Sequence, residues 1–397
     1  MFKGKKINSS LMILAFIMLI NAMSSGILIP LLYPYSSKFG INPLGLSLLF
    51  ASFAFFQFLS TPIIGRLADR YGRKPLLLMS IFGSFLSLAL FASAQSIFVL
   101  FLARILDGIT GGNISVAQAM IADTTTGKER TEGFGILGAM WGLGFLIGPA
   151  IGGIMSTFSL TAPFWFASFL ALLATILGAI ILKEPLVEKV ISKQKSEPLF
   201  NFKAIAVALL SPTIGSALLL TFISYFAHHA LIIAFQTYTV DELKLNVQTI
   251  GIIFAAIGLI LIFIRSIGIR FVLDRVRSNR KIITVSLLLS SFSLFLLSFF
   301  SGLTAFLIFT FSYVAVYSLI HPILTNIISK RVNVEDQGVA LGINQSYASL
   351  GQVLGPVSAG IISQISVKLI FSWSSLLLFI GFLLSYYLKT ASKKADL

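Results

Sequence analysis

Two residues of opposite charge, Arg104 and Asp107, stand three positions apart inside a long apolar run. Residues at this spacing share one face of a helix, so their side chains are close enough to pair. An apolar environment favours the neutral acid of an aspartate, whereas a neighbouring arginine favours the carboxylate. A carboxyl group between these influences can take up and release a proton. The alternative is a static ion pair that only makes the burial of charge tolerable.

The helix that must position this pair is predicted over 97–122 and has a polar, small face along its whole length. Asp107 is the only carboxylate deep inside any helix that the sequence predicts. We therefore take Arg104 and Asp107 as candidate proton-coupling residues. The other members of this face recur at three- and four-residue spacing: Gly108, Gly111, Ser115 and Gln118.

The composition is that of a membrane protein. The chain is 57% hydrophobic and 11% charged, with a mean hydropathy of +0.96, whereas a soluble domain is about 25% charged. The absence of cysteine excludes disulfides and thiolate metal sites. The three histidines have no metal-ligand spacing, and no phosphate-binding P-loop motif is present. We expect no metal, no cofactor and no enzyme activity.

About 20 apolar residues are needed to cross a bilayer, so run length is the signal to count. The first run follows Lys3, Lys5 and Lys6 and continues to about Leu32 without a cleavage site, which predicts a retained helix. An even number of spans places both termini on one side. The twelve predicted spans are 10–34, 44–64, 76–95, 97–122, 134–157, 163–182, 205–237, 247–269, 282–300, 302–327, 338–363 and 368–388.

Lysine and arginine give the orientation. Nearly all of the 29 lie in segments on the side of the termini. The exceptions are Lys38, Lys244 and Lys368 on the other side, and Arg104 inside a helix. Positive residues are retained in the cytoplasm, so both termini are predicted to be cytoplasmic. This distribution also excludes nucleic acid as the reason for the net charge of +15.

The chain repeats internally. Gly144-x-x-x-Gly148-Pro149 has an echo in Gly351-x-x-x-Gly355-Pro356, and the charged stretch at 65–70 has a weaker one at 268–275. A polar stretch with two prolines separates the copies. We predict an all-α integral membrane protein with twelve transmembrane helices in two pseudo-symmetric six-helix bundles. The bundles are 1–182 and 204–397, and a cytoplasmic linker at 183–203 joins them.

The stretch from Gly65 to Pro75 reads GRLADRYGRKP and carries five charged side chains between two apolar runs. Charges are costly in hydrocarbon, so it is predicted to be a hairpin at the membrane surface. A basic loop that only sets the topology would account for its positive charges. It would not account for Asp69 or for the two glycines, Gly65 and Gly72.

The order G-x-L-A-D-R-x-G-R-K resembles the signature between the second and third helices of the major facilitator superfamily. The resemblance implies two parallel six-helix repeats with the substrate between them near the midplane. It also implies that basic residues and a nearby helix N-terminus hold the aspartate and close the cytoplasmic side. The residues implied in this gate are Gly65, Asp69, Arg70, Gly72, Arg73, Asp274 and Arg275.

A glycine-rich helix carries a second resemblance. Its glycines at three- and four-residue spacing let another helix approach closely, and a proline permits a bend. The pattern resembles the antiporter motif of proton-driven drug exporters, although ordinary close packing is an alternative explanation. The stretch 101–153 is similar to the tetracycline-exporter branch, in which Arg104 matches an arginine associated with proton coupling. The motif residues are Gly144, Gly148, Pro149, Gly152 and Gly153.

Two departures make tetracycline with its bound cation a doubtful substrate. Asn21 stands where that branch has an aspartate, and 282–300 contains no acidic residue. The C-terminal half offers uncharged polar and aromatic groups instead. His228 or His229 could relay protons, or could simply be hydrogen-bonded to a neighbouring helix. The candidate substrate-cavity residues are Asn21, Gln57, Asn113, Gln118, Tyr225, His228, His229, Gln236, Tyr317, His321 and Asn344.

These observations predict a secondary active transporter that exports a small amphipathic compound in exchange for protons. The closest alternative is a proton symporter that imports or exports a metabolite, sugar or siderophore. A receptor, a membrane enzyme and a channel fit less well, because there is no large soluble segment, no nucleophile–base set and no simple pore pattern. The expected partners are a small molecule, protons and lipid. We expect a monomer in a bacterial inner membrane.

Overall fold

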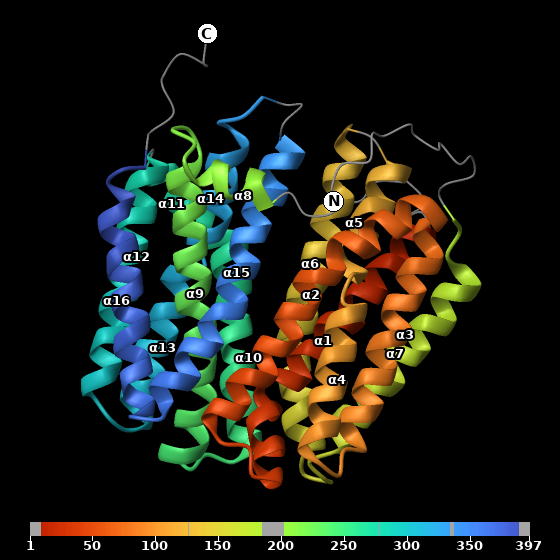
Figure 1. Ribbon diagram of the computed structural model, residues 1–397, viewed down its shortest axis with the longest axis horizontal. Coiled ribbons are helices and arrows are strands. Elements are labelled where there is room, and N and C mark those ends of the chain that lie inside the picture. Colours follow the sequence, from red (N-terminus) through yellow and green to blue (C-terminus); the bar gives the residue numbers. More distant parts are fainter. Residues whose placement is uncertain (1–8, 126, 185–201, 277, 334–336, 389–397) are drawn as a thin grey trace. The chain divides into compact units, whose positions relative to one another are not determined.

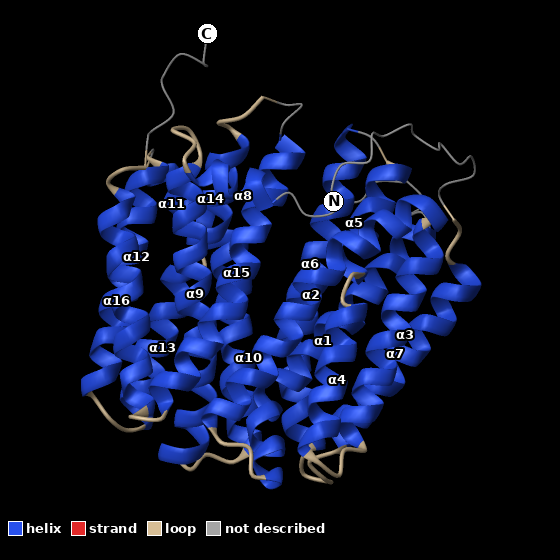
Figure 2. Ribbon diagram, viewed as in Figure 1, coloured by secondary structure: helices blue, strands red, loops and turns tan. Residues whose placement is uncertain are grey.

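The computed structural model describes residues 9–125, 127–184, 202–276, 278–333 and 337–388 (Figure 1). All regular structure in this part of the chain is helical (Figure 2). Eleven of its helical segments are long and apolar enough to cross a membrane. The prediction of an all-α membrane fold is confirmed.

The span predicted at 338–363 is a helix, α15 (Gln337–Ser363), but it is not among those eleven. Its 27 residues give it the length of a span, whereas its polar side chains lower its hydropathy. Two of these side chains are buried against protein: Asn344 is 3% exposed and accepts a hydrogen bond from Thr221 Oγ1 at 2.8 Å. Tyr347 is also buried. The neighbouring helices therefore take the place of lipid around these two side chains.

The chain divides into two compact units. Unit 1 comprises Met1–Ile41, Ser52–Phe200 and Asn246–Gly258. Unit 2 comprises Asn42–Ala51, Asn201–Leu245 and Leu259–Leu397. The boundaries therefore fall inside two helices, α2 and α10, as well as between helices. Most of the predicted linker at 183–203 lies outside the described residues.

Unit 1 is built from the helices of the N-terminal half and the first part of α10. Its elements, of which α2 and α10 belong to it only in part, are α1 (Ser9–Ser36), the 3₁₀ turn η1 (Ser37–Phe39), α2 (Pro43–Tyr71), α3 (Arg73–Ala92), α4 (Ile97–Thr110), α5 (Asn113–Thr124), α6 (Gly127–Met155), α7 (Ala162–Ile181) and α10 (Val247–Phe263).

Unit 2 holds the first part of α2 up to Ala51, the remainder of α10, α15 and the other helices of the C-terminal half. These other elements are α8 (Phe202–Leu209), α9 (Gly215–Thr237), η2 (Tyr238–Glu242), η3 (Ile264–Gly268), α11 (Ile269–Arg275), α12 (Asn279–Phe299), α13 (Leu303–Tyr317), α14 (Ile320–Ser329) and α16 (Val367–Ser385). Of these, η2 and η3 are π-helical.

Several predicted helices differ from the observed ones. The span at 97–122 is broken at Gly111 and Gly112 into α4 and α5, and the span at 302–327 is broken at 318–319 into α13 and α14. The span at 205–237 begins later, because residues 210–214 separate α8 from α9. The span at 247–269 continues through η3 and α11 to Arg275.

Glycines bring α6 against α1 in unit 1. A Cβ on Gly144 would lie 2.8 Å from the Met23 backbone nitrogen, and one on Gly148 would lie 2.6 Å from the Met23 carbonyl oxygen. Both distances are too short for any side chain, so the backbones meet directly. Gly153 lies on another side of α6, next to Gly251 of α10.

Unit 2 repeats this contact between α15 and α9. A Cβ on Gly351 would lie 2.7 Å from the Phe226 backbone nitrogen, and one on Gly355 would lie 2.5 Å from the Phe226 carbonyl oxygen. The repeated sequence motif therefore makes the same helix–helix contact in both units.

We expect Gly148→Ala to destabilise the protein by about 1–3 kcal/mol, because the new methyl group would meet a backbone atom that cannot move aside. Thermal unfolding in detergent measures the change. Gly138→Ala is the matched control in the same helix, since a Cβ there would have no neighbour within 4 Å. Equal melting temperatures for the two variants would contradict the close approach of α1 and α6.

Candidate functional site

Arg104 and Asp107 form an ion pair on α4. Arg104 Nη1 lies 3.2 Å from Asp107 Oδ2, and the Arg104 side chain is 5% exposed against 21% for Asp107. Ser84 of α3 donates a hydrogen bond to Asp107 Oδ1 at 3.3 Å. The guanidinium carbon of Arg104 lies 4.2 Å from the centre of the Phe53 ring of α2. Three helices therefore contribute to one charged site.

Each contact offsets part of the cost of a charge in the membrane. The carboxylate neutralises the guanidinium, and the Phe53 ring face attracts the cation. Arg104 Nε has no hydrogen-bond acceptor among the described residues. Asp107 is the more exposed partner of the pair, and its second carboxylate oxygen accepts the hydrogen bond from the Ser84 hydroxyl.

The helix is interrupted one turn beyond this pair, between α4 and α5. Side chains from neighbouring helices satisfy the backbone groups at the break, as a low-dielectric environment requires. Gln57 Nε2 donates to the Gly111 carbonyl at 3.2 Å, and Ser60 Oγ donates to the Gly108 carbonyl at 2.8 Å. The Gly112 nitrogen donates to Ser80 Oγ at 3.1 Å. Side chains of α2 and α3 therefore stabilise the interruption between α4 and α5.

The other predicted polar residues of unit 1 have different surroundings. Asn113 Nδ2 donates to Asn21 Oδ1 at 2.7 Å and joins α5 to α1. Gln57 is engaged with the helix break. Gln118 is exposed. The structure thus brings Asn21 and Asn113 together and leaves Gln118 apart from them.

In unit 2, the predicted aromatic and histidine residues form one cluster on α9, α13 and α14. His228 Nδ1 lies 3.0 Å from the Tyr313 hydroxyl. The His228 and Tyr317 rings stack with centroids 4.7 Å apart, and Tyr317 donates to the Ser224 carbonyl at 2.9 Å. His228 is thus bonded to a neighbouring helix, one of the two alternatives for the histidines.

The rest of the cluster surrounds Tyr225. Its ring stacks on His229 with centroids 5.8 Å apart and meets His321 edge-on at 5.3 Å. His229 Nδ1 donates to the Tyr225 carbonyl at 2.9 Å, because a carbonyl can only accept. Gln236 is buried further along α9. In the described part of the chain, no group of three or more His, Asp or Glu side chains could hold a metal ion.

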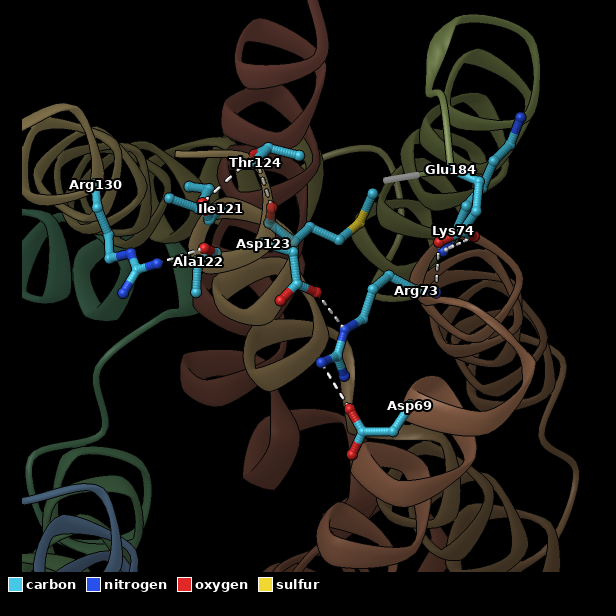
Figure 3. Close-up of polar contacts among 10 residues, drawn as sticks. Asp69, Arg73, Lys74, Ile121, Ala122, Asp123, Thr124, Arg130 and Glu184 are labelled. Carbon is cyan, nitrogen blue, oxygen red and sulfur yellow. Dashed lines mark hydrogen bonds and ion pairs between the residues drawn. The ribbon is translucent and has the colours of Figure 1, made fainter. Parts of the chain in front are cut away.

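The hairpin is shorter than predicted. Gly65 and the residues up to Tyr71 belong to α2, and only Gly72, with φ 105°, separates α2 from α3. Arg73 Nη2 lies 2.6 Å from Asp69 Oδ1, and Arg73 Nε lies 2.8 Å from Asp123 Oδ2 (Figure 3). Arg73 therefore links α2, α3 and α5 through two carboxylates.

Among the described residues of the corresponding hairpin in unit 2, Asp274 and Arg275 take part in no ion pair like those of Arg73. Asp274 and Arg275 are exposed at the end of α11, and the Arg275 guanidinium carbon lies 3.5 Å from the centre of the Phe271 ring. Arg70 likewise lies over a ring, that of Tyr71, at 5.3 Å. The ion-pair chain around Arg73 belongs to unit 1.

Several residues of these sites were missed in the sequence. Asp123, Ser84 and Phe53 lie on other helices, and nothing in their local sequence indicates the contact. Glu184 was also missed: its oxygens accept hydrogen bonds from the Arg73 and Lys74 backbone nitrogens, both at 2.9 Å (Figure 3). Its only local signal is a carboxylate two residues after the end of an apolar run.

We expect Arg104→Gln to cost about 3–5 kcal/mol of folding stability, because it leaves Asp107 as an unpaired buried charge. The double variant Arg104→Gln with Asp107→Asn removes both charges and should recover most of that loss. A double-mutant cycle on thermal unfolding measures the coupling. Additive effects of the two single substitutions would contradict the pair.

Comparison with known proteins places the chain in a family. The family model of the Major Facilitator Superfamily matches residues 14–278 and 217–396. The chain is 29% identical to quinolone resistance protein NorA of Staphylococcus aureus, over 91% of this chain and 92% of that protein. It is 30% identical to the class E tetracycline resistance protein of Escherichia coli, over 88% and 87%.

Solved structures agree on the fold. The nucleoside transporter NupG superposes with a TM-score of 0.79 at 14% identity, over 96% of this chain and 100% of that chain. The human organic anion transporter MFSD10 superposes with a TM-score of 0.70 at 20% identity, over 95% and 99%. The protein is therefore a multi-pass membrane transporter, not an enzyme, and it belongs to the major facilitator superfamily.

Proposed function

We propose that this transporter exports small amphipathic compounds in exchange for protons. The observation that carries the proposal is the ion pair between Arg104 and Asp107 inside a membrane-spanning segment. A buried ionisable residue in such a segment is costly and is usually retained for function. Protonation of Asp107 removes half of the pair and changes what Arg104 must contact.

The helix break next to the pair supports this role. A change at Asp107 lies within one turn of Gly111 and Gly112, where α4 gives way to α5. The backbone groups there are held by side-chain hydrogen bonds, which can be exchanged more readily than a continuous helix can be bent. Protonation and movement of α5 can be linked at this position.

The relatives support the direction of transport. Proteins named for resistance to quinolones and tetracycline, and a multidrug resistance protein of Bacillus subtilis that is 27% identical, match about nine-tenths of the chain. Asn21 hydrogen-bonds to Asn113, so an amide pair occupies a place where the tetracycline exporters have a carboxylate. This difference argues for a substrate other than tetracycline with its cation.

The proposal also covers the substrate site, the cytoplasmic gate and the membrane in which the protein works. The substrate meets the polar and aromatic side chains of both units, with Tyr225, His228 and Tyr317 as the candidates in unit 2. The hairpin around Arg73 serves as the cytoplasmic gate, with both termini on that side. The protein works in a bacterial inner membrane as a monomer, and protons are its second ligand.

A second candidate is a proton symporter for a metabolite, sugar or siderophore. The observation in its favour is that no carboxylate lies within the aromatic cluster of unit 2 among the described residues, which suits a neutral or polar ligand as well as an amphipathic one. The two candidates differ in the sign of the proton movement that a substrate drives.

We expect that an exported compound added to everted vesicles, acidified inside, releases protons from the lumen. The panel contains a quinolone, tetracycline, a cationic dye and several metabolites. Asp107→Asn should abolish the release, because an amide cannot carry the proton. Asp241→Asn is the matched control, since Asp241 lies in η2 near the end of a span.

Each result has a defined meaning. Release in wild type and in Asp241→Asn but not in Asp107→Asn supports antiport through Asp107. Release that survives Asp107→Asn contradicts the assignment of Asp107 as the proton carrier. Proton uptake in place of release contradicts antiport and supports the symporter.

A further inference from the structure

The start of α3 needs a partner that its own sequence does not supply. The first backbone N–H groups of a helix have no acceptor within the helix, and a side chain at the N-cap position usually accepts from one of them. The N-cap residue of α3 is Gly72, which has no side chain to offer. Its φ of 105° is a conformation that favours glycine, so a capping residue cannot readily replace it.

Glu184 supplies the missing cap from the far end of unit 1. Its Oε1 accepts from the Arg73 nitrogen and its Oε2 from the Lys74 nitrogen, both at 2.9 Å (Figure 3). The residue lies just after α7, at the start of the predicted linker at 183–203. A carboxylate at a helix N-terminus is also favoured by the helix dipole.

The glycine and the carboxylate fit each other. A Cβ on Gly72 would lie 2.7 Å from Glu184 Oε2, so only glycine lets the carboxylate approach this closely. A second bond ties the same elements, because Lys74 Nζ donates to the Ala179 carbonyl of α7 at 2.7 Å. The start of α3 therefore both donates to Glu184, which follows α7, and donates through Lys74 to the last turn of α7.

In unit 2, the corresponding helix start is capped by a residue of its own sequence. The helix that follows its copy of the hairpin is α12, and the N-cap residue Ser278 accepts from the Lys281 nitrogen with its own hydroxyl at 3.4 Å. A self-capped helix start is thus available to this fold. Unit 1 uses a distant carboxylate instead, and it does so at the residue whose side chain holds the ion-pair chain.

We propose that Glu184 is a positioning residue for the gate: its carboxylate fixes the backbone of Arg73, and thereby the place of the Arg73 side chain between Asp69 and Asp123. The segment leaving α7 is then coupled to the hairpin. A displacement of that segment moves the Arg73 backbone, and opening of the hairpin breaks the hydrogen bonds to Glu184. This inference rests on the proposed role of the hairpin as the cytoplasmic gate.

Single-cysteine labelling tests the coupling directly, because the full chain contains no cysteine. Ala68→Cys places a reporter at a fully buried position of α2, next to Asp69. Its rate of reaction with a small maleimide measures local opening of the hairpin. Ala227→Cys, at a fully buried position of α9 in unit 2, reports any general loosening.

We expect Glu184→Gln to speed labelling of Ala68→Cys by about five- to tenfold, the effect of losing a helix cap. Glu184→Asp keeps the charge on a shorter side chain and should restore part of the protection. Lys183→Gln removes the charge of the exposed neighbouring residue and should leave the rate unchanged. Ala227→Cys should react at the same rate in all of these backgrounds.

Two results would overturn the proposal. An unchanged rate at Ala68→Cys in Glu184→Gln would show that the cap does not hold the hairpin. An equal rise at Ala227→Cys would show that Glu184 only stabilises the fold. The assay needs neither substrate nor a proton gradient, so its outcome is separate from that of the flux assay. For a compound that the flux assay identifies, Glu184→Gln should change kcat and leave KM unaltered.

Discussion

A buried arginine in a membrane-spanning segment has to be neutralised, and much of unit 1 follows from that requirement. Arg104 obtains its counter-charge from Asp107 on the same helix and its aromatic contact from Phe53 on α2. Asp107 in turn uses Ser84 on α3. Since the charge cannot be exposed to lipid cheaply, these three helices are constrained to pack around it. The site and the packing are one arrangement.

The two units share a scaffold but differ in chemistry. In both, glycines on one helix let a partner helix approach to backbone contact, as at Gly148 and Gly355. Unit 1 adds charges to this scaffold, at Asp107 within the span and around Arg73 at its end. In the described spans of unit 2, a neutral cluster of tyrosine and histidine occupies α9, α13 and α14. The two units therefore differ in the kind of side chain that they hold within the membrane-spanning segments.

Much of this was readable in the sequence, for physical reasons. A charge pair at helical spacing, a glycine repeat and a charged turn between apolar runs are local patterns, and they predicted the fold, the family, the pairing residues and the helix contacts. The breaks at Gly111 and Gly112 and at 318–319 were missed, because each lies inside a run long enough to cross the membrane as one helix. The helix α15 was predicted as the span at 338–363, but the sequence left open which of its polar side chains are buried, as Asn344 and Tyr347 are.

Glu184 shows why the rest could not be predicted. Its hydrogen bonds join residues that are 110 and 111 positions apart, and they exist only because α3 begins close to the place where α7 ends. The same is true of Asp123, which reaches Arg73 across 50 positions. Contacts of this kind depend on the assembled unit, and the sequence contains no local trace of them.

The central claim is that Asp107 changes its protonation state and is not a fixed member of an ion pair. Infrared difference spectroscopy of the purified protein during a pH titration tests this most directly, because a protonated carboxyl group has its own C=O stretching band. We predict a band that grows as the pH falls and is absent in Asp107→Asn. A wild-type spectrum with no such band at any pH, or one that Asp107→Asn leaves unchanged, would contradict the account.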